Sequence, residues 1–217
     1  MSKTAEATNG AKPLLASRKP SRAKRQEPTL RRQDLLRVTV SCLARLGPRG
    51  TTGREICRQA GVSHGLLRHY FENPDNLLLE TYQQLCDEFL ARFEVALTDH
   101  PQNPWKSMEC MFETMFSHDW ANAEVLGAWT AFWTLVPNNP DFAAVSEGFD
   151  QRLRKMMRKA IERLPRNHLT LSMKDTIAIL LAVMDGLWLD FCLAPNRTSR
   201  SRAIALCKSA ARQLFGE

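Results

Sequence analysis

Hydrogen-bond donors gather in one short part of the chain, the segment TTGREICRQAGVSHGLLRHYF at residues 51–71. At helical spacing, four polar side chains fall on the outward side of its second half: Ser63, His64, Arg68 and His69. Hydroxyl, imidazole and guanidinium groups on the exposed face of a short helix can reach base edges and phosphates in the DNA major groove. The segment therefore predicts a contact with double-stranded DNA.

Two short helices must position these donors. The apolar residues fall where crossing helices would press their inner faces together, namely Ile56, Ala60, Val62, Leu67 and Tyr70. Gly61 suits the end of the first helix because glycine tolerates positive φ. Ser63 is expected to cap the second helix at the backbone N–H of Leu66, and Thr51 or Thr52 the first. The pattern is that of a helix-turn-helix, and a plain helical hairpin is the alternative.

A second interpretation of the same residues is catalytic. The sequence GVSHG at residues 61–65 matches the GxSxG turn that carries the nucleophile of serine hydrolases. That turn follows a buried strand, whereas GREICRQA before it has charged residues at helical spacing. No convergent acids, bases or metal ligands appear elsewhere. We therefore predict no catalytic residues, no cofactor and no enzyme activity.

The segment from Leu30 to Leu85 resembles the DNA-binding domain of TetR-type transcriptional regulators. The resemblance covers a first helix, LRRQDLLRVTVSCLARLG, the helix-turn-helix, and the closing HYFENPDNLLLE. It implies phosphate contacts from Thr52, His69 and Tyr70 and base contacts from Ser63, His64 and Arg68. Thr51 completes the predicted DNA-binding set.

Two positions depart from the family pattern. Arg68 stands where a tyrosine is common, and Pro74 stands where a lysine usually opens the fourth helix and meets phosphate. Proline suits the first turn of a helix capped by Asn73. The departures therefore leave one contact with the DNA phosphate backbone in doubt, whereas the fourth helix can still form.

Charge is unevenly distributed along the 217 residues, whose net charge is +7. Residues 1–27 carry 7 basic and 2 acidic side chains, residues 28–72 carry 8 and 3, and residues 73–217 carry 15 and 18. A basic head on a slightly acidic body is expected when one end of a protein neutralises phosphates. Residues 1–27 have few large apolar side chains, so we expect a disordered basic tail, either a solubilising extension or an arm along DNA.

The rest of the chain predicts an all-α protein. Asn–Pro pairs at 73–74, 103–104 and 139–140 each join a cap to a first-turn proline, and further helices are expected at about 121–135, 172–193 and 199–215. The expected organisation is a helix-turn-helix three-helix domain at 28–73, followed by a larger ligand-binding and dimerisation domain at 74–217.

Aromatic stripes in this larger domain suggest a ligand site. Trp129, Phe132 and Trp133 share one helical face, and Met184 and Trp188 share another beside Asp185. Such stripes are commonly plain core. Facing tryptophans with a carboxylate could instead cage a quaternary ammonium, so these six residues form the predicted ligand site.

The sequences AWTAFW and MDGLWL resemble the C-terminal domain of the BetI subfamily of TetR-type regulators, which are choline-responsive repressors. The resemblance extends over most of residues 30–215. It implies a repressor released from a palindromic operator by choline or another quaternary amine. A different hydrophobic or amine effector, such as an efflux substrate, is the alternative, and a helical protein-interaction adaptor is a further one.

The last helix supplies a candidate dimer interface. One of its faces carries Ile204, Cys207, Ala211 and Leu214, which could form a four-helix contact with the helix at 172–193 across a two-fold axis. Packing within one subunit is the alternative. A homodimer is favoured because TetR-type regulators read two successive major grooves.

The remaining features exclude other classes. Six cysteines show no CxxC pair and no clustering with histidine along the chain, so no metal site is predicted. No apolar run approaches the roughly 18 residues that span a bilayer, and no signal-peptide core is present. The expected protein is cytoplasmic, with no membrane partner.

Overall fold

The computed structural model describes residues 28–164 and 171–215, and this part of the chain is helical without strands. The predicted fold class, all-α, is confirmed. The elements in chain order are α1 (Pro28–Gly50), α2 (Gly53–Ala60), α3 (His64–Phe71), α4 (Pro74–Thr98), α5 (Pro104–Met115), α6 (Ala123–Leu135), the short 3₁₀ helix η1 (Val136–Asn138), α7 (Pro140–Glu162), α8 (Met173–Leu193) and α9 (Arg200–Phe215).

Polar caps start most of these helices. Asn73, Asn103 and Asn139 accept hydrogen bonds from the first turns of α4, α5 and α7, each of which carries proline at its start. The cap satisfies a backbone N–H that has no partner within the helix, and proline removes another such donor. All three predicted starts are therefore confirmed.

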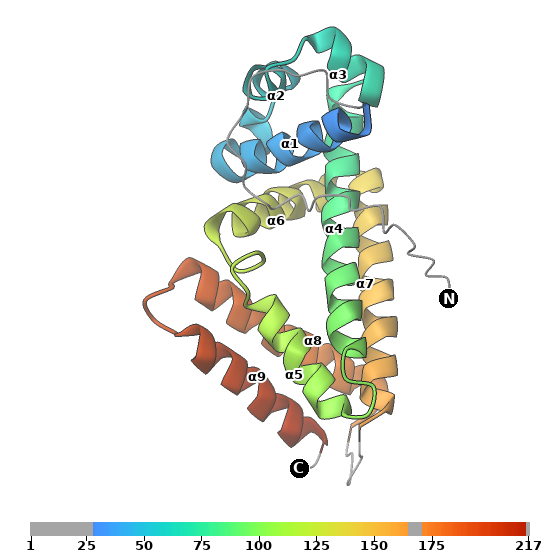
Figure 1. The fold of residues 1–217 in the computed structure, drawn as a ribbon, viewed down its shortest axis with the longest axis vertical. Coiled ribbons are helices and arrows are strands. Elements are labelled where there is room, and N and C mark those ends of the chain that lie inside the picture. The colour runs from blue at the N-terminus through green and yellow to red at the C-terminus, as the bar shows by residue number, and fades with distance from the viewer. Residues whose placement is uncertain (1–27, 165–170, 216–217) are drawn as a thin grey trace, which may run out of the picture.

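The arrangement separates two ends of an elongated molecule. In Figure 1, α1, α2 and α3 lie together at one end, and α8 and α9 lie towards the other. α4 contacts α1 and α3 near its start and α5 and α7 along the rest of its length, so it connects the two ends. The predicted boundary after residue 73 thus falls at the cap of the connecting helix. The predicted tail at residues 1–27 lies outside the described part of the chain.

The contact between α1 and α6 joins the two ends a second time. A Cβ atom added to Gly127 of α6 would lie 2.8 Å from both the Cα and the carbonyl oxygen of Ala44 in α1. Backbone atoms cannot yield as a flexible side chain can, so only glycine permits this approach. The α6 helix of the body therefore lies directly against α1.

One helix is apolar enough to need explanation. α8 has the length and composition of a membrane span, with a mean hydropathy of 1.9 in its most apolar window, of which 33% is buried. The expectation that no apolar run approaches such a length is therefore wrong. In this structure α8 packs against α6, α7 and α9, so it serves as a body helix that leaves an apolar face uncovered.

Candidate nucleic-acid interface and effector site

The helix-turn-helix has the packing that its sequence predicts. Ile56 of α2 and Leu67 of α3 are fully buried, and Ala60, Val62 and Tyr70 pack around them partly buried. Gly61 ends α2 with φ of 64°. The inner faces therefore hold the two helices together and leave their other faces to solvent.

Ser63 starts α3 as predicted. Its Oγ accepts a hydrogen bond of 3.2 Å from the backbone N–H of Leu66. The side chains of Ser63, His64, Arg68 and His69 are all exposed, which leaves their polar groups open to a DNA groove. Tyr70 is half-buried, and its ring meets that of His69 edge-on at 5.2 Å between centroids. The predicted donors thus share one exposed helix.

The two threonines before α2 have different roles. Thr52 is exposed and accepts a hydrogen bond from Glu55 N at 3.2 Å, so it is the cap of α2. Thr51 is 4% exposed, and its hydroxyl donates to the carbonyl of Gly47 at 2.7 Å. That hydroxyl bonds to the kink of α1 at Gly47, whose φ is 66°. The predicted DNA contact from Thr51 is wrong in this structure, because its side chain is internal.

Charge on the exposed side of this end is basic. Arg58 of α2 forms two short hydrogen bonds to Glu55, at 2.8 and 2.6 Å, and these bonds together with Gln59 lower the pKa of Glu55 to about 2. The carboxylate therefore stays ionised and offsets the charge of Arg58. Other exposed arginines surround the helix-turn-helix: Arg45, Arg49, Arg54 and Arg68.

Pro74 has a packing role that the sequence did not reveal. A Cβ added to Gly53 at the start of α2 would lie 2.7 Å from Cγ of Pro74 and 3.4 Å from Cε1 of His64. The starts of α2, α3 and α4 therefore meet at Gly53. The Pro74 ring and the His64 side chain therefore both lie against Gly53.

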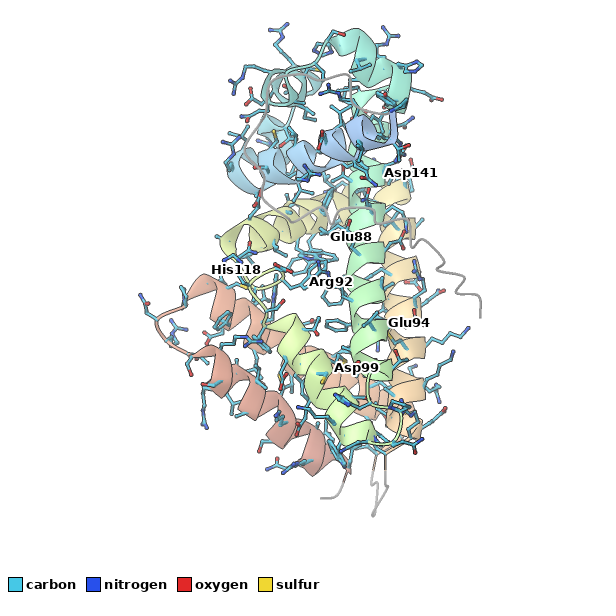
Figure 2. The ribbon with its side chains drawn as sticks, in the orientation of Figure 1. Glu88, Arg92, Glu94, Asp99, His118 and Asp141 are labelled. Carbon is cyan, nitrogen blue, oxygen red and sulfur yellow. The ribbon has the colours of Figure 1, made fainter. Side chains whose placement is uncertain are left out.

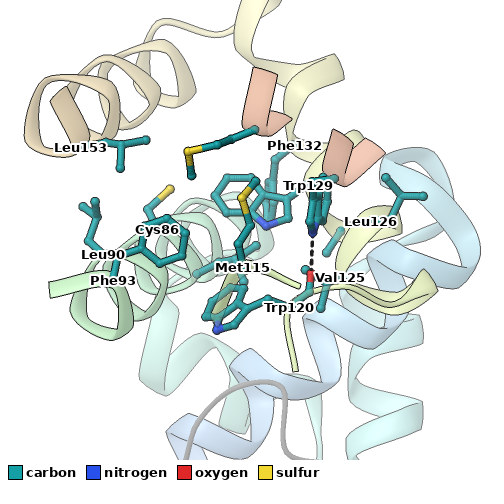
Figure 3. Close-up of a cluster of buried hydrophobic side chains, with 14 of the residues drawn as sticks. Cys86, Leu90, Phe93, Met115, Trp120, Val125, Leu126, Trp129, Phe132 and Leu153 are labelled. Atoms are coloured by element: carbon teal, nitrogen blue, oxygen red, sulfur yellow. Dashed lines mark hydrogen bonds between the residues drawn. The ribbon is translucent and has the colours of Figure 1, made fainter. Parts of the chain in front are cut away.

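The aromatic residues of the body form a second site candidate. Trp129 is 5% exposed and Phe132 fully buried, whereas Trp133 is 42% exposed at the edge of the cluster. The ring of Trp129 lies 5.5 Å from Phe149 of α7 and 6.2 Å from Trp133, measured between centroids. Figure 3 shows Trp129 and Phe132 among buried apolar side chains. These separations are those of rings in direct contact.

The stripe on α8 joins the same buried region. Met184 and Trp188 are 1% and 7% exposed, and the Trp188 indole N–H donates to the carbonyl of Trp120 at 3.0 Å, the dashed line in Figure 3. Asp185 is exposed on another side of α8, near Asp150 and Arg154 of α7. Partial desolvation and the Asp150 charge raise its pKa. The charged neighbours of Asp185 are thus on α7, and the pairing of this carboxylate with the cage stays a prediction.

Besides Phe149, three further ring-bearing residues of the cluster were not predicted from the sequence. Tyr82 and Phe89 of α4 lie 6.1 and 6.0 Å from Trp129, and Trp120 lies 5.2 Å from Phe89. Tyr82 and Phe89 are seven residues apart on one helix, a spacing that could have revealed them. The buried indole N–H of Trp120 has no hydrogen-bond partner among the described residues. This region of the body therefore contains an unused donor beside aromatic rings.

The predicted dimer residues on α9 face inward for the most part. Ile204 is 8% exposed, and Cys207 and Ala211 are fully buried within the subunit. Leu214 is half-buried. The stripe packs against the body, so the prediction that Ile204, Cys207 and Ala211 contact a second subunit is wrong in this arrangement. Leu206, Ala210 and Leu214 border this buried stripe and are partly exposed.

Two protein families match this chain, one at the helix-turn-helix end and one in the rest of the fold. Residues 35–81 match the family described as bacterial regulatory proteins of the tetR family, and residues 106–216 match the C-terminal domain of BetI-type transcriptional repressors. The HTH-type transcriptional regulator BetI of Serratia proteamaculans is 29% identical over 181 residues, covering 82% of this chain and 88% of the relative. BetI of Stenotrophomonas maltophilia is also 29% identical, covering 81% and 89%.

A solved structure extends the similarity to three dimensions. A protein of Pseudomonas aeruginosa PAO1, described as a transcriptional regulator, superposes with a TM-score of 0.80 at 26% identity, covering 88% of this chain and 93% of that one. The helix-turn-helix geometry and the two family matches together account for most of the described residues. The chain therefore belongs to the TetR family, as a DNA-binding transcriptional regulator with a BetI-type C-terminal domain.

Proposed function

We propose that this protein is a homodimeric repressor that holds a palindromic operator and releases it when a small cationic molecule, choline in the first instance, binds among the body's aromatic rings. The observation that carries the proposal is the exposed face of α3, where a capped helix presents hydroxyl, imidazole and guanidinium donors. Ser63, His64 and Arg68 would contact bases, and Thr52, His69 and Tyr70 would contact phosphates.

A second copy of the chain is the partner that suits the uncovered face of α8. Ile179 is 40% exposed, Ala182 and Gly186 are exposed, and Val183 is partly exposed. These residues form an apolar stripe at helical spacing on α8. A partner helix can approach closely at Gly186, where an added Cβ would meet nothing within 4 Å. Two-fold pairing here supports a dimer with two recognition helices, roughly 34–36 Å apart in operator complexes of this type.

The aromatic cluster supports the cationic class of effector. Ring faces attract a quaternary ammonium, and the buried N–H of Trp120 can donate to a hydroxyl or carboxylate on the same ligand. Because the rings around Trp129 already touch, the ligand must displace at least one of them. Movement of α6, which carries Trp129, would reach α1 through the contact of Gly127 with Ala44. Such a ligand favours one of two dimer geometries over the other.

Titration calorimetry with choline tests the effector. We expect heat of binding to the wild-type protein and an affinity lower by about tenfold in Trp133→Ala, because one cation–π contact contributes roughly 0.5–2 kcal/mol. Trp133 is the suitable position because it is 42% exposed and its loss leaves little cavity. The control is Trp105→Ala, a tryptophan of α5 whose ring meets Phe215. Equal affinity in the two variants would contradict the proposed site.

A further inference from the structure

Three potential metal ligands meet where α4 turns into α5. Asp99 and His100 follow α4, and Cys110 lies on α5. A carboxylate oxygen, an imidazole nitrogen and the thiol sulfur from these residues all lie within 4.8 Å of one another, and His100 Nε2 is 3.5 Å from Asp99 Oδ2. Figure 2 shows Asp99 at the end of α4 that lies away from α3. This group could not be recognised from the sequence, because His100 and Cys110 are ten residues apart and Cys110 lies on a separate helix.

The backbone that carries these residues is held in place. Ser107 is 1% exposed, and its hydroxyl donates to the carbonyl of His100 at 3.0 Å. Arg163 of α7 donates to the carbonyls of Leu97 and Pro101, at 3.1 and 2.8 Å, on either side of the turn. Only side-chain rotation is then needed to bring the ligand atoms together. Asp99 and His100 have that freedom, with side chains 63% and 39% exposed.

Local charge favours a cation. Three carboxylates, those of Glu113, Asp99 and Glu109, lie close enough to the Cys110 sulfur to act on its charge, as does the ammonium of Lys106. The Lys106 ammonium lies 3.7 and 3.9 Å from Glu109 and Glu113, and Lys208 lies 3.3 Å from Glu109. With three carboxylates and two ammonium groups nearby, a divalent cation at the sulfur meets a net negative surrounding.

We propose that Asp99, His100 and Cys110 bind a divalent metal ion of the zinc type, which links the end of α4 to α5. Thiolate, imidazole and carboxylate together select zinc and its neighbours, whereas magnesium and calcium prefer oxygen ligands throughout. The thiol gives up its proton to solvent as the metal–sulfur bond forms. Three protein ligands leave one tetrahedral position for water.

Two of the three proposed ligands line a groove. Asp99 and Cys110 line a surface groove of about 650 Å³ between α4 and α5, together with Arg92, Ala96 and Glu113. Solvent and metal can therefore enter without displacing the aromatic core. The site is independent of the proposed effector site, because none of its three ligands belongs to the ring cluster.

Cobalt(II) titration of the reduced full-length protein tests the site, because a thiolate–cobalt bond gives a charge-transfer absorption band that oxygen or nitrogen ligands do not. We expect this band in the wild type, none in Cys110→Ser, and at least a tenfold lower affinity in His100→Ala and Asp99→Ala. Cys192→Ser removes another half-buried thiol, and His118→Ala removes a histidine outside the cluster. Both control variants should keep the band at wild-type affinity.

Two results would overturn the proposal. The first is absence of a thiolate band in the wild type at millimolar cobalt(II), and the second is a band of equal affinity in His100→Ala. His100 is exposed, so its alanine variant should fold and give an interpretable answer if Cys110→Ser does not. Circular dichroism of each variant checks that point directly.

Discussion

Replacing Arg68 and His69 together by alanine is expected to weaken operator binding at least about a hundredfold. Both side chains are exposed on α3, the helix proposed to enter the major groove. An arginine contact to a guanine edge is worth roughly 1–3 kcal/mol, and a dimer loses it at both half-sites. Fluorescence anisotropy with a labelled fragment of the promoter of the protein's own gene measures the loss.

A second double substitution distinguishes specific DNA contacts from the effect of general positive charge. Arg158 and Lys159 are adjacent, exposed cations of α7, away from the helix-turn-helix. The double variant Arg158→Ala with Lys159→Ala removes comparable charge and should bind operator within about twofold of the wild type, because charges beyond a Debye length are screened. Equal losses in the two double variants would mean that α3 contributes only general positive charge.

The variant Gly186→Arg is expected to be monomeric and to lose nearly all operator affinity. Gly186 lies on the exposed apolar side of α8, and a Cβ there meets nothing within the subunit, so the variant should fold. Arginine is also a better helix former than glycine. A bulky charge between two copies would prevent close approach of the α8 helices. Sedimentation velocity reports the oligomeric state, and anisotropy reports the loss of DNA binding.

Gly148→Arg is the control for that experiment. Gly148 lies on α7 and also has open space around an added Cβ, so the substitution has the same intrinsic effect on a helix. This variant should remain dimeric and bind DNA normally. A dimeric Gly186→Arg with full operator affinity would exclude the proposed α8 interface while leaving the recognition helix untouched.

Local chemistry explains which parts of the fold were predictable. The turn of the helix-turn-helix depends on Gly61 and Ser63, whose backbone conformation and capping bond are decided by their immediate neighbours. The Asn–Pro pairs at the starts of α4, α5 and α7 are equally local. Such features can be identified without knowing what any helix packs against.

Tertiary contacts explain the errors. The apolar stripe containing Cys207 and Ala211 was found, but periodicity shows that a helix has an apolar face without showing whether a second subunit or the body covers it. Thr51 carries a hydroxyl suited to phosphate, yet that hydroxyl donates inward to the carbonyl of Gly47 at the kink of α1.

The aromatic cluster shows the same limit. Trp129 and Phe132 were recognised from their spacing on one helix, whereas Phe149 is brought to Trp129 only by the packing of α7. The cluster of Asp99, His100 and Cys110 likewise depends on how α5 folds back along α4. A site whose residues come from several helices is hard to recognise from the sequence of any one of them.

Binding of the wild-type protein to its own promoter fragment across a salt series tests the central claim most directly. We predict a sequence-specific complex that contains two copies of the chain and protects a palindromic site. The affinity of this complex should fall by orders of magnitude between low and physiological salt, because salt screens the phosphate contacts. A complex with no preference for the promoter over unrelated DNA, or an affinity that salt barely changes, would contradict the account.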